Sequence, residues 1–160
     1  MIDDSALQAA KARAAYQARP WLKHYSSFVQ PDLTTRFSNA LEMFLAAVKV
    51  MPGQPAAYYF DETMTYGELD RESTALASAL KERGVMYGDR VALYLQNIPQ
   101  FLIAMYALWK VGAIVVLCNP MFKQKELEYH LNDSGAKGLI FGHDPKQIKE
   151  IRLAPQAFYD

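Results

Sequence analysis

The chain is poor in cysteine and carries no excess of either charge. Cys118 is the one cysteine among 160 residues, so no disulfide can form within the chain. A reducing compartment is therefore expected, and we predict a cytoplasmic protein. The 17 basic and 17 acidic side chains cancel. A dedicated nucleic-acid binder usually has a basic excess, so no nucleic-acid partner is expected.

Targeting and membrane-spanning segments are also missing. The opening stretch MIDDSALQAAKARAAYQARPWLKHY is charged and rich in alanine, without the apolar centre of a secretory signal. Residues 101–118, FLIAMYALWKVGAIVVLC, approach the length of a membrane span, but Lys110 and Gly112 interrupt them. We interpret this stretch as a buried helix ending at Gly112, followed by a buried strand, and predict no transmembrane segment.

The familiar glycine-rich and nucleophile motifs do not occur. The sequence has no GxxxxGK[ST] phosphate loop, no GxGxxG and no GxSxG elbow. Carboxylates and cysteine do not cluster at metal-ligand spacing, so no metal site is predicted. Cys118 lies in an apolar run, which favours a small buried hydrophobic residue over a nucleophile. From the residues alone, no catalytic side chain can be assigned.

The three histidines are far apart in sequence. His24 lies near an aromatic-rich arm, and His130 lies beside the apolar face of a predicted helix, where packing or exposure is favoured over a ligand role. His143 and Asp144 follow a predicted strand, which is where a site can form. Because Pro145 comes next, Asp144 is more typical of a helix cap followed by its first turn.

What is present is enough apolar sequence for a core. Hydrophobic residues make up 51% of the chain and charged residues 21%, in the range of a globular domain. Residues 1–33 are interpreted as an N-terminal helix at 5–18 and a docking arm anchored by Trp21 and Tyr25. Residues 34–160 are interpreted as one α/β subdomain. A helix at 37–50, a strand at 56–60, a turn and a short return strand at 64–66 open that subdomain.

The next helix, predicted at 65–83, has clear start and stop signals. Thr65 is a good N-cap, and Glu68 three residues later completes a capping box. Gly84 suits the left-handed position after a helix, with Val85 as the hydrophobic contact beyond it. The buried face is predicted to carry Leu69, Leu76 and Leu80.

Strands and helices then alternate to the end of the chain. Strands are predicted at 90–96, 113–118 and 136–141, and helices at 98–111 and 123–135. A further helix is predicted to start within residues 144–151, and residues 152–160 follow it without a predicted element. This order predicts an α/β fold with a largely parallel sheet and helices on both faces. Ligands of such sheets bind beyond the carboxyl ends of the strands, which here are residues 95–97, 118–120 and 141–144.

Four pieces of this region carry a family resemblance: TYGELDRES, GDRVALYLQN, ALWKVGAIVVLCNP and ELEYHLNDSGAK. In this order and at this spacing, they resemble the N-terminal subdomain of the adenylate-forming (AMP-binding) acyl-CoA synthetase superfamily. The arm RPWLKHY followed by LTTRFSNALEMF further resembles the bacterial long-chain fatty acid–CoA ligases. The resemblance covers roughly residues 20–141.

The resemblance implies a two-step ligase that uses ATP, CoA and Mg²⁺. A fatty acid carboxylate attacks the α-phosphate of ATP to give an acyl-adenylate and pyrophosphate, and CoA then displaces AMP. The family's Ser/Thr/Gly-rich phosphate loop, its later adenine and ribose motifs and its C-terminal catalytic lysine have no match in the chain. We therefore expect an incomplete N-terminal part of a longer ligase, inactive by itself, with no cofactor bound and no catalytic or metal residue.

One assignment of site residues follows from the resemblance. In some relatives the loop that matches Cys118, Asn119 and Pro120 lies near the CoA entrance, although a purely structural turn is favoured. The alternatives left open are a stand-alone, non-catalytic binding module, or another adenylate-forming ligase that acts on an aryl acid or loads a carrier protein. A homodimer through the N-terminal arm and a peripheral association with the inner membrane are further expectations.

Overall fold

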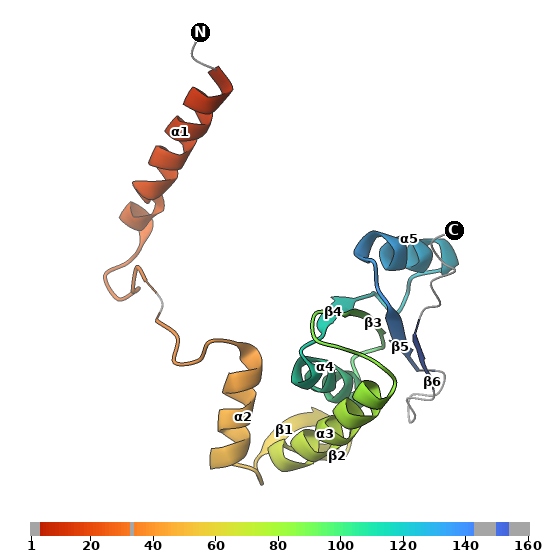
Figure 1. Cartoon of the computed structure of the whole chain (residues 1–160). Coiled ribbons are helices and arrows are strands. Elements are labelled where there is room, and N and C mark those ends of the chain that lie inside the picture. The colour runs from red at the N-terminus through yellow and green to blue at the C-terminus, as the bar shows by residue number, and fades with distance from the viewer. Residues whose placement is uncertain (1–3, 33, 143–149, 154–160) are drawn as a thin grey trace. The chain divides into compact units, whose positions relative to one another are not determined.

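The structure is a computed structural model, and it describes residues 4–32, 34–142 and 150–153. The chain divides into two compact units, residues 1–36 and residues 37–160 (Figure 1). The two units are described separately below.

The first unit is a helix and a short arm that folds on itself. Helix α1 (Asp4–Gln17) is followed by the 3₁₀ helix η1 (Pro20–His24). Arg19, which precedes the proline, has left-handed backbone geometry, with φ 49°. Its guanidinium lies 2.9 Å from Asp32 Oδ1 and donates to the Pro31 carbonyl at 2.6 Å. The Trp21 ring packs against Tyr16 with centroids 4.9 Å apart.

The second unit begins with helix α2 (Ala40–Val50) and a hairpin of β1 (Pro55–Tyr59) and β2 (Glu62–Thr65). The helix starts three residues later than predicted because Asn39 caps it, with Oδ1 accepting from the Glu42 amide at 2.8 Å. The return strand starts at Glu62 rather than at residue 64. Phe60, with φ 50°, makes the turn tighter than the sequence suggested.

Helix α3 (Tyr66–Glu82) confirms the predicted start and stop signals. The Thr65 amide donates to Glu68 Oε2 at 2.8 Å, and the Glu68 amide donates to Thr65 Oγ1 at 3.2 Å. At the other end Gly84 has φ +85°, and the Val85 amide reaches the Leu80 carbonyl at 3.1 Å. The predicted face needs one correction, since it consists of Leu69, Ser73, Ala77 and Leu80, whereas Leu76 is only partly buried.

The main sheet has the strand order β4-β3-β5-β6. Its strands and helices, in chain order, are β3 (Arg90–Tyr94), α4 (Pro99–Val111), β4 (Ile114–Leu117), α5 (Gln124–Ser134), β5 (Gly138–Phe141) and β6 (Glu150–Leu153). Strand β3 pairs in parallel with both β4 and β5, while β6 runs antiparallel to β5. The sheet is therefore largely parallel, as predicted, with one antiparallel edge strand.

The element predicted from residue 144 onward is wrong where it can be compared. Residues 143–149, with His143 and Asp144, lie outside the described residues. Glu150–Leu153 is a strand and not part of a helix. Pairing with β5 supplies backbone hydrogen bonds along the edge of β5 that β3 leaves free, which a helix could not do.

Helices cover both faces of the sheet, and β3 alternates between them. Val91 and Leu93 face the core formed with α3 and α4, while Ala92 faces a second core formed with α5. Figure 1 shows α3 and α4 on one side of the sheet and α5 on the other. All three of these β3 side chains are fully buried, as predicted for a strand covered on both sides.

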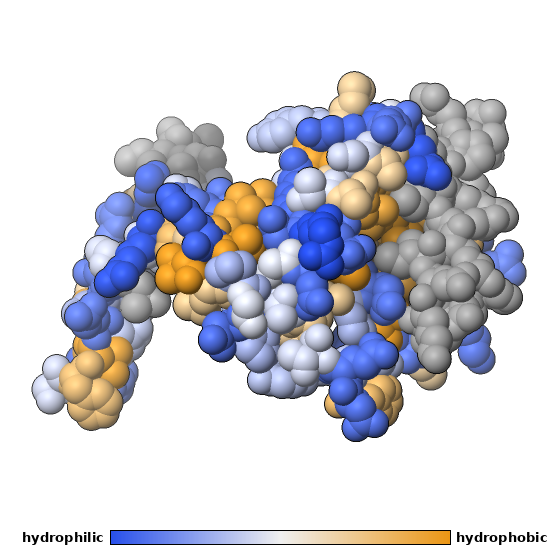
Figure 2. All heavy atoms as spheres, turned by 90° about the horizontal axis from the view of Figure 1, so that it is seen from below, coloured by the Kyte–Doolittle hydropathy of each residue, from blue (hydrophilic) through white to orange (hydrophobic). Residues whose placement is uncertain are grey.

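Strand β4 differs from the prediction of a buried strand. It lies at the end of the described sheet, and Ile114 and Leu117 are 48% and 62% exposed. Apolar side chains also reach the surface elsewhere, and Figure 2 shows hydrophobic residues among hydrophilic ones on one face of the molecule. No helix in the described part of the chain is long and apolar enough to cross a membrane.

Lys110, which interrupts the apolar run, lies in the contact between α4 and α3. Its Nζ is 2.7 Å from Asp70 Oδ1 and 2.8 Å from the Asp70 carbonyl oxygen. It is also 2.8 Å from Ser73 Oγ and 2.7 Å from Thr74 Oγ1. The Phe44 ring of α2 lies 5.7 Å away. This set of acceptors explains how an ammonium group can sit among apolar neighbours with only 13% of its side chain exposed.

Candidate functional site

A hollow of about 230 Å³ lies where the parallel strands end. It joins the segment after β3, the loop after β4 and the residue after β5. The parallel pairing of β3 with both neighbours brings these three carboxyl ends to one edge, as the topology predicts. The lining residues are Tyr59, Tyr94, Leu95, Gln96, Ile98, Pro120 and Gly142.

The loop at residues 118–122 is held in one conformation by three hydrogen bonds. Asn119 Oδ1 accepts from the Met121 amide at 2.9 Å, and the Asn119 carbonyl accepts from the Phe122 amide at 3.0 Å. The Tyr94 hydroxyl donates to the Phe122 carbonyl at 2.8 Å and ties the loop to the end of β3. This loop is therefore a fixed wall of the hollow.

The three residues that the resemblance singled out have different surroundings. Pro120 lines the hollow, whereas Asn119 makes the turn. Cys118 is 5% exposed and packs with Ala92 and Ala136 on the α5 side of the sheet. Burial raises the pKa of the Cys118 thiol, which disfavours the thiolate. The interpretation of Cys118 as a small buried residue is confirmed.

The predicted packing role of His130 is also confirmed. Its ring stacks on Phe122 with centroids 4.6 Å apart and planes at 12°. Phe122 in turn packs against the core under α5. His130 therefore supports the far side of the loop and does not face the hollow's lining.

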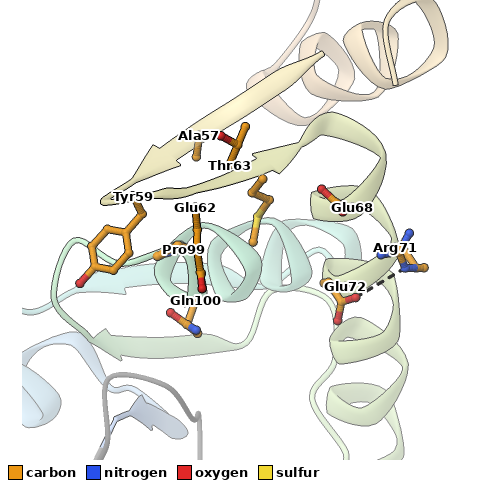
Figure 3. A pocket seen from close by; sticks show the side chains of 10 residues that line it. Ala57, Tyr59, Glu62, Thr63, Glu68, Arg71, Glu72, Pro99 and Gln100 are labelled. Atoms are coloured by element: carbon orange, nitrogen blue, oxygen red, sulfur yellow. Dashed lines mark ion pairs between the residues drawn. The ribbon is translucent and has the colours of Figure 1, made fainter. Parts of the chain in front are cut away.

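A second hollow, of about 260 Å³, lies between the hairpin and the first turns of α3 and α4. Figure 3 shows its lining side chains, which include Glu62, Glu68, Arg71, Glu72 and Gln100. Bonds from the Thr65 amide and hydroxyl lower the pKa of Glu68, and Arg71 Nε lies 3.5 Å from Glu72 Oε1. Carboxylates outnumber the one cation, so the hollow is acidic.

Tyr59 connects these hollows. It lines both of them and also a third, of about 270 Å³, which includes Asn97, Phe101 and Leu102. The sequence analysis placed Tyr59 in a strand and gave it no role at the site. Only the docking of the hairpin near the strand ends reveals its position, and no local motif signals that.

The described residues do not fit the phosphates of ATP or a magnesium ion. The hollow at the strand ends has no cationic side chain, and the hollow beside the hairpin is acidic. Within the described ranges, no group of three or more metal-ligating side chains converges. Phosphate sites need lysine, arginine or a glycine-rich nest, so no step through ATP is assigned to these residues. Tyrosines and apolar residues at the strand ends suit an uncharged or amide-bearing group.

The family is decided by a match over most of the chain. Residues 44–157 match the family described as AMP-binding enzyme. The chain belongs to this family. The resemblance to the adenylate-forming, AMP-binding superfamily is thereby confirmed.

Curated relatives include several bacterial ligases named long-chain-fatty-acid–CoA ligase. The protein from Yersinia pestis is 38% identical over 134 residues, which cover 80% of this chain and 24% of the relative. The protein from Bacillus subtilis is 30% identical over 122 residues, covering 76% of this chain and 22% of the relative. The chain thus spans about a quarter of the length of these relatives.

Solved structures of adenylate-forming enzymes share the fold. The NpsA N-terminal subdomain from Klebsiella oxytoca, in complex with anthranilyl-AMSN, gives a TM-score of 0.64 at 25% identity and covers 72% of this chain and 33% of that one. The fused NpsA-ThdA adenylation-PCP di-domain gives 0.62 at 30% identity over 63% of this chain and 19% of that one. The predicted α/β fold of an N-terminal subdomain is confirmed.

Proposed function

We propose that the chain forms the first part of an ATP-dependent fatty acid–CoA ligase. The observation that carries this proposal is its 38% identity to the Yersinia pestis long-chain-fatty-acid–CoA ligase across 80% of the chain. In the proposed reaction, a fatty acid and ATP give an acyl-adenylate and pyrophosphate. The CoA thiol then takes the acyl group and releases AMP, so that the products are acyl-CoA, AMP and pyrophosphate.

The described residues support a scaffolding role in this reaction. ATP, CoA and Mg²⁺ supply the activating chemistry, and the hollows lack the cations that phosphates require. We therefore propose that the chain is inactive by itself and that its catalytic groups belong to other parts of the ligase. The tether from Tyr94 to Phe122 holds one wall of the strand-end hollow in place for such groups.

The loop of Cys118, Asn119 and Pro120 is proposed to border the route of CoA. Pro120 lines the strand-end hollow with Tyr59 and Tyr94, and none of these side chains carries a charge. This lining suits the pantetheine arm of CoA better than its phosphates. The fixed turn at Asn119 would keep that route open. The proposed location is the cytoplasm, with peripheral association to the inner membrane as the second possibility.

The first test is to sequence the source gene beyond the codon for Asp160. The proposal expects an open frame of several hundred codons that encodes a Ser/Thr/Gly-rich loop ending in Pro-Lys-Gly. The encoded protein should then form acyl-CoA from palmitate, ATP, Mg²⁺ and CoA, while the 160-residue chain should form none. An immediate stop codon would instead favour a non-catalytic binding module.

A second candidate function is the activation of an aryl acid. It is favoured by the similarity at 30% identity to Klebsiella oxytoca NpsA, whose structure holds 3-hydroxyanthranilyl-AMSN. Pyrophosphate exchange into ATP, measured with the full encoded protein, separates the two candidates. Exchange that depends on palmitate and not on anthranilate supports the fatty acid ligase, and the reverse supports the aryl-acid ligase.

A further inference from the structure

The loop that follows β4 is attached to β3 at both of its ends. At its start, the Cys118 amide donates to the Leu93 carbonyl at 3.1 Å. At its end, the Tyr94 hydroxyl donates to the Phe122 carbonyl at 2.8 Å, between residues 28 positions apart in sequence. Pro120, which lines the strand-end hollow, lies midway between these two attachments. The placement of Pro120 therefore depends on two neighbouring residues of one strand.

The two hydrogen bonds accepted by Asn119 act inside the loop. Its Oδ1 accepts from the Met121 amide at 2.9 Å, and its carbonyl accepts from the Phe122 amide at 3.0 Å. Both bonds join residues two or three positions apart, so they fix the shape of the turn. They do not fix where the turn lies against the sheet, because both partners move with the loop. The bond from Tyr94 supplies that placement at the far end.

Phe122 is also held by its side chain, on the α5 side of the sheet. Its ring stacks on His130 with centroids 4.6 Å apart and packs against the second core. Ring pairs keep their attraction over a range of centroid distances, roughly 4.5–7 Å. A hydrogen bond weakens steeply away from its preferred length and direction. The bond from Tyr94 therefore restricts the position of the loop more tightly than the stacked rings do.

The Tyr94 ring has its own packing, which does not depend on the hydroxyl. The ring is partly buried against Ala92, Cys118 and Ala136. A phenylalanine in its place would keep these contacts, so Tyr94→Phe removes the hydroxyl and leaves the packing. The net contribution of one protein hydrogen bond changes an equilibrium by roughly 2–10-fold. That is the size of effect to expect on the opening of the loop.

We propose that Tyr94 is a positioning residue, whose hydroxyl fixes the loop after β4 and thereby sets the place of Pro120 at the strand-end hollow. Tyr94 acts through the loop and is not a catalytic group. One consequence rests on the proposed function, in which this loop borders the route of CoA. Loss of the hydroxyl should then impair the use of CoA more than the use of the fatty acid.

Hydrogen exchange measured by NMR on the 160-residue chain tests the placement of the loop directly. The Phe122 amide reports on the far end of the loop. Tyr94→Phe should raise its exchange rate by roughly 2–10-fold, because the loop opens more often without the bond. The amides of Val91 and Leu93, inside β3, should keep their exchange rates.

Two control variants separate the placement of the loop from a general loss of stability. Tyr129→Phe removes a hydroxyl from a 64% exposed position of α5 and should leave exchange at Phe122 unchanged. Leu76→Ala removes packing from the core formed with α3 and α4, away from the loop. It should lower the free energy of unfolding and still raise exchange at Phe122 less than Tyr94→Phe does.

Steady-state kinetics of the full encoded protein test the consequence for the reaction. Tyr94→Phe should raise the KM for CoA by about threefold or more and leave the KM for palmitate unchanged. Tyr129→Phe should leave both KM values unchanged. A merely structural role of Tyr94 would instead lower the amount of active protein and leave both KM values as they are.

Three results would overturn the proposal. Exchange at Phe122 could stay the same in Tyr94→Phe, or it could rise equally in Tyr129→Phe. The KM values for CoA and palmitate could also change by the same factor. Failure of the proposed function has a different signature, since the full encoded protein would then show no palmitate-dependent pyrophosphate exchange. Exchange at Phe122 in the 160-residue chain would still decide the role of Tyr94.

Discussion

The ammonium of Lys110 lies 2.7 Å from Asp70 Oδ1, in a bridge that joins the last turn of α4 to α3. Only 13% of the Lys110 side chain and 33% of the Asp70 side chain are exposed. Removing one partner leaves the other partly desolvated. The bridge therefore matters more than an ion pair on the open surface would.

Lys110→Met should lower the free energy of unfolding by about 1–3 kcal/mol, because the partly buried Asp70 loses its hydrogen-bonded partner. Urea denaturation of the two proteins measures this difference. Asp70→Asn and the double variant complete a mutant cycle, with an expected coupling of about 1 kcal/mol. Additive effects of the two substitutions would show that the bridge contributes nothing beyond packing.

Leu80 and Leu76 lie on the same helix and differ in burial. Leu80 is fully buried, while Leu76 is partly buried against the same core. Leu80→Ala should cost about 3–4 kcal/mol of stability and Leu76→Ala about half as much. Denaturant melts of both variants provide the comparison. A larger loss for Leu76→Ala would contradict the observed face of α3.

Asp89 makes the stability of the chain depend on acid. The hydrogen bond from Lys137 at 2.6 Å, followed by the bond from the Met86 amide at 2.9 Å, holds the pKa of Asp89 below its ordinary value of 3.8. Because the folded pKa lies below the unfolded one, the stabilisation is fully present above the unfolded pKa. It is lost as the pH falls through the folded pKa.

Asp89→Asn should therefore be less stable than the unsubstituted chain at pH 7. The difference in stability between the two proteins should become smaller as the pH falls below 3.8. Thermal melts at several pH values measure the gap. Asp133→Asn is a suitable control at a carboxylate without a described salt bridge to a lysine or arginine. A gap for Asp89→Asn that stays constant with pH would refute the proposed linkage.

Substitutions at Gly112 and Gly84 distinguish the cost of backbone strain from the cost of a close side-chain contact. Both have φ +85°, but a Cβ on Gly112 would lie 2.4 Å from Tyr87 Cδ2, while a Cβ on Gly84 would meet nothing within 4 Å. Gly84→Ala should cost about 1–2 kcal/mol, the usual penalty for left-handed geometry. Gly112→Ala should cost more, and Tyr87→Ala should remove most of the excess. If Gly112→Ala still cost more stability than Gly84→Ala in the Tyr87→Ala background, contact with Tyr87 would not be the cause.

The Cys118 thiol should react slowly with a disulfide reagent in the native chain at pH 7. Burial raises its pKa and also blocks access. In urea the same thiol should react at the rate of a free cysteine. Fast native labelling would mean that the loop at 118–122 opens, and it would revive a direct role for Cys118 at the site.

Much of the second unit could be predicted because its signals are local. The capping box at Thr65 and Glu68 and the stop at Gly84 define α3 within one residue of the prediction. The apolar run after Arg90 predicted a strand covered on both faces, and Val91 is fully buried. Such features depend on neighbours within a few residues, so a single sequence contains them.

The wrong predictions concern features that depend on contacts between residues far apart in the sequence. The sequence of β4 reads as a buried strand, but its place in the strand order, which no local pattern encodes, leaves Leu117 exposed. Likewise, residues 150–153 pair with β5, although residues 150 and 151 were predicted to belong to a helix. Tyr59 reaches the strand-end hollow only because the hairpin lies beside it.

The central position of β3 has a consequence for how the chain folds during synthesis. Strand β3 is the first of the described strands of its sheet to leave the ribosome, and β4 and β5 each pair with it directly. Among the described strands, the two later parallel ones, β4 and β5, therefore each add to a strand that has already been synthesised. Domains tend to fold from the N-terminus as they emerge, and short crossovers close with little entropy cost. This strand order suits vectorial folding from the centre of the sheet outward.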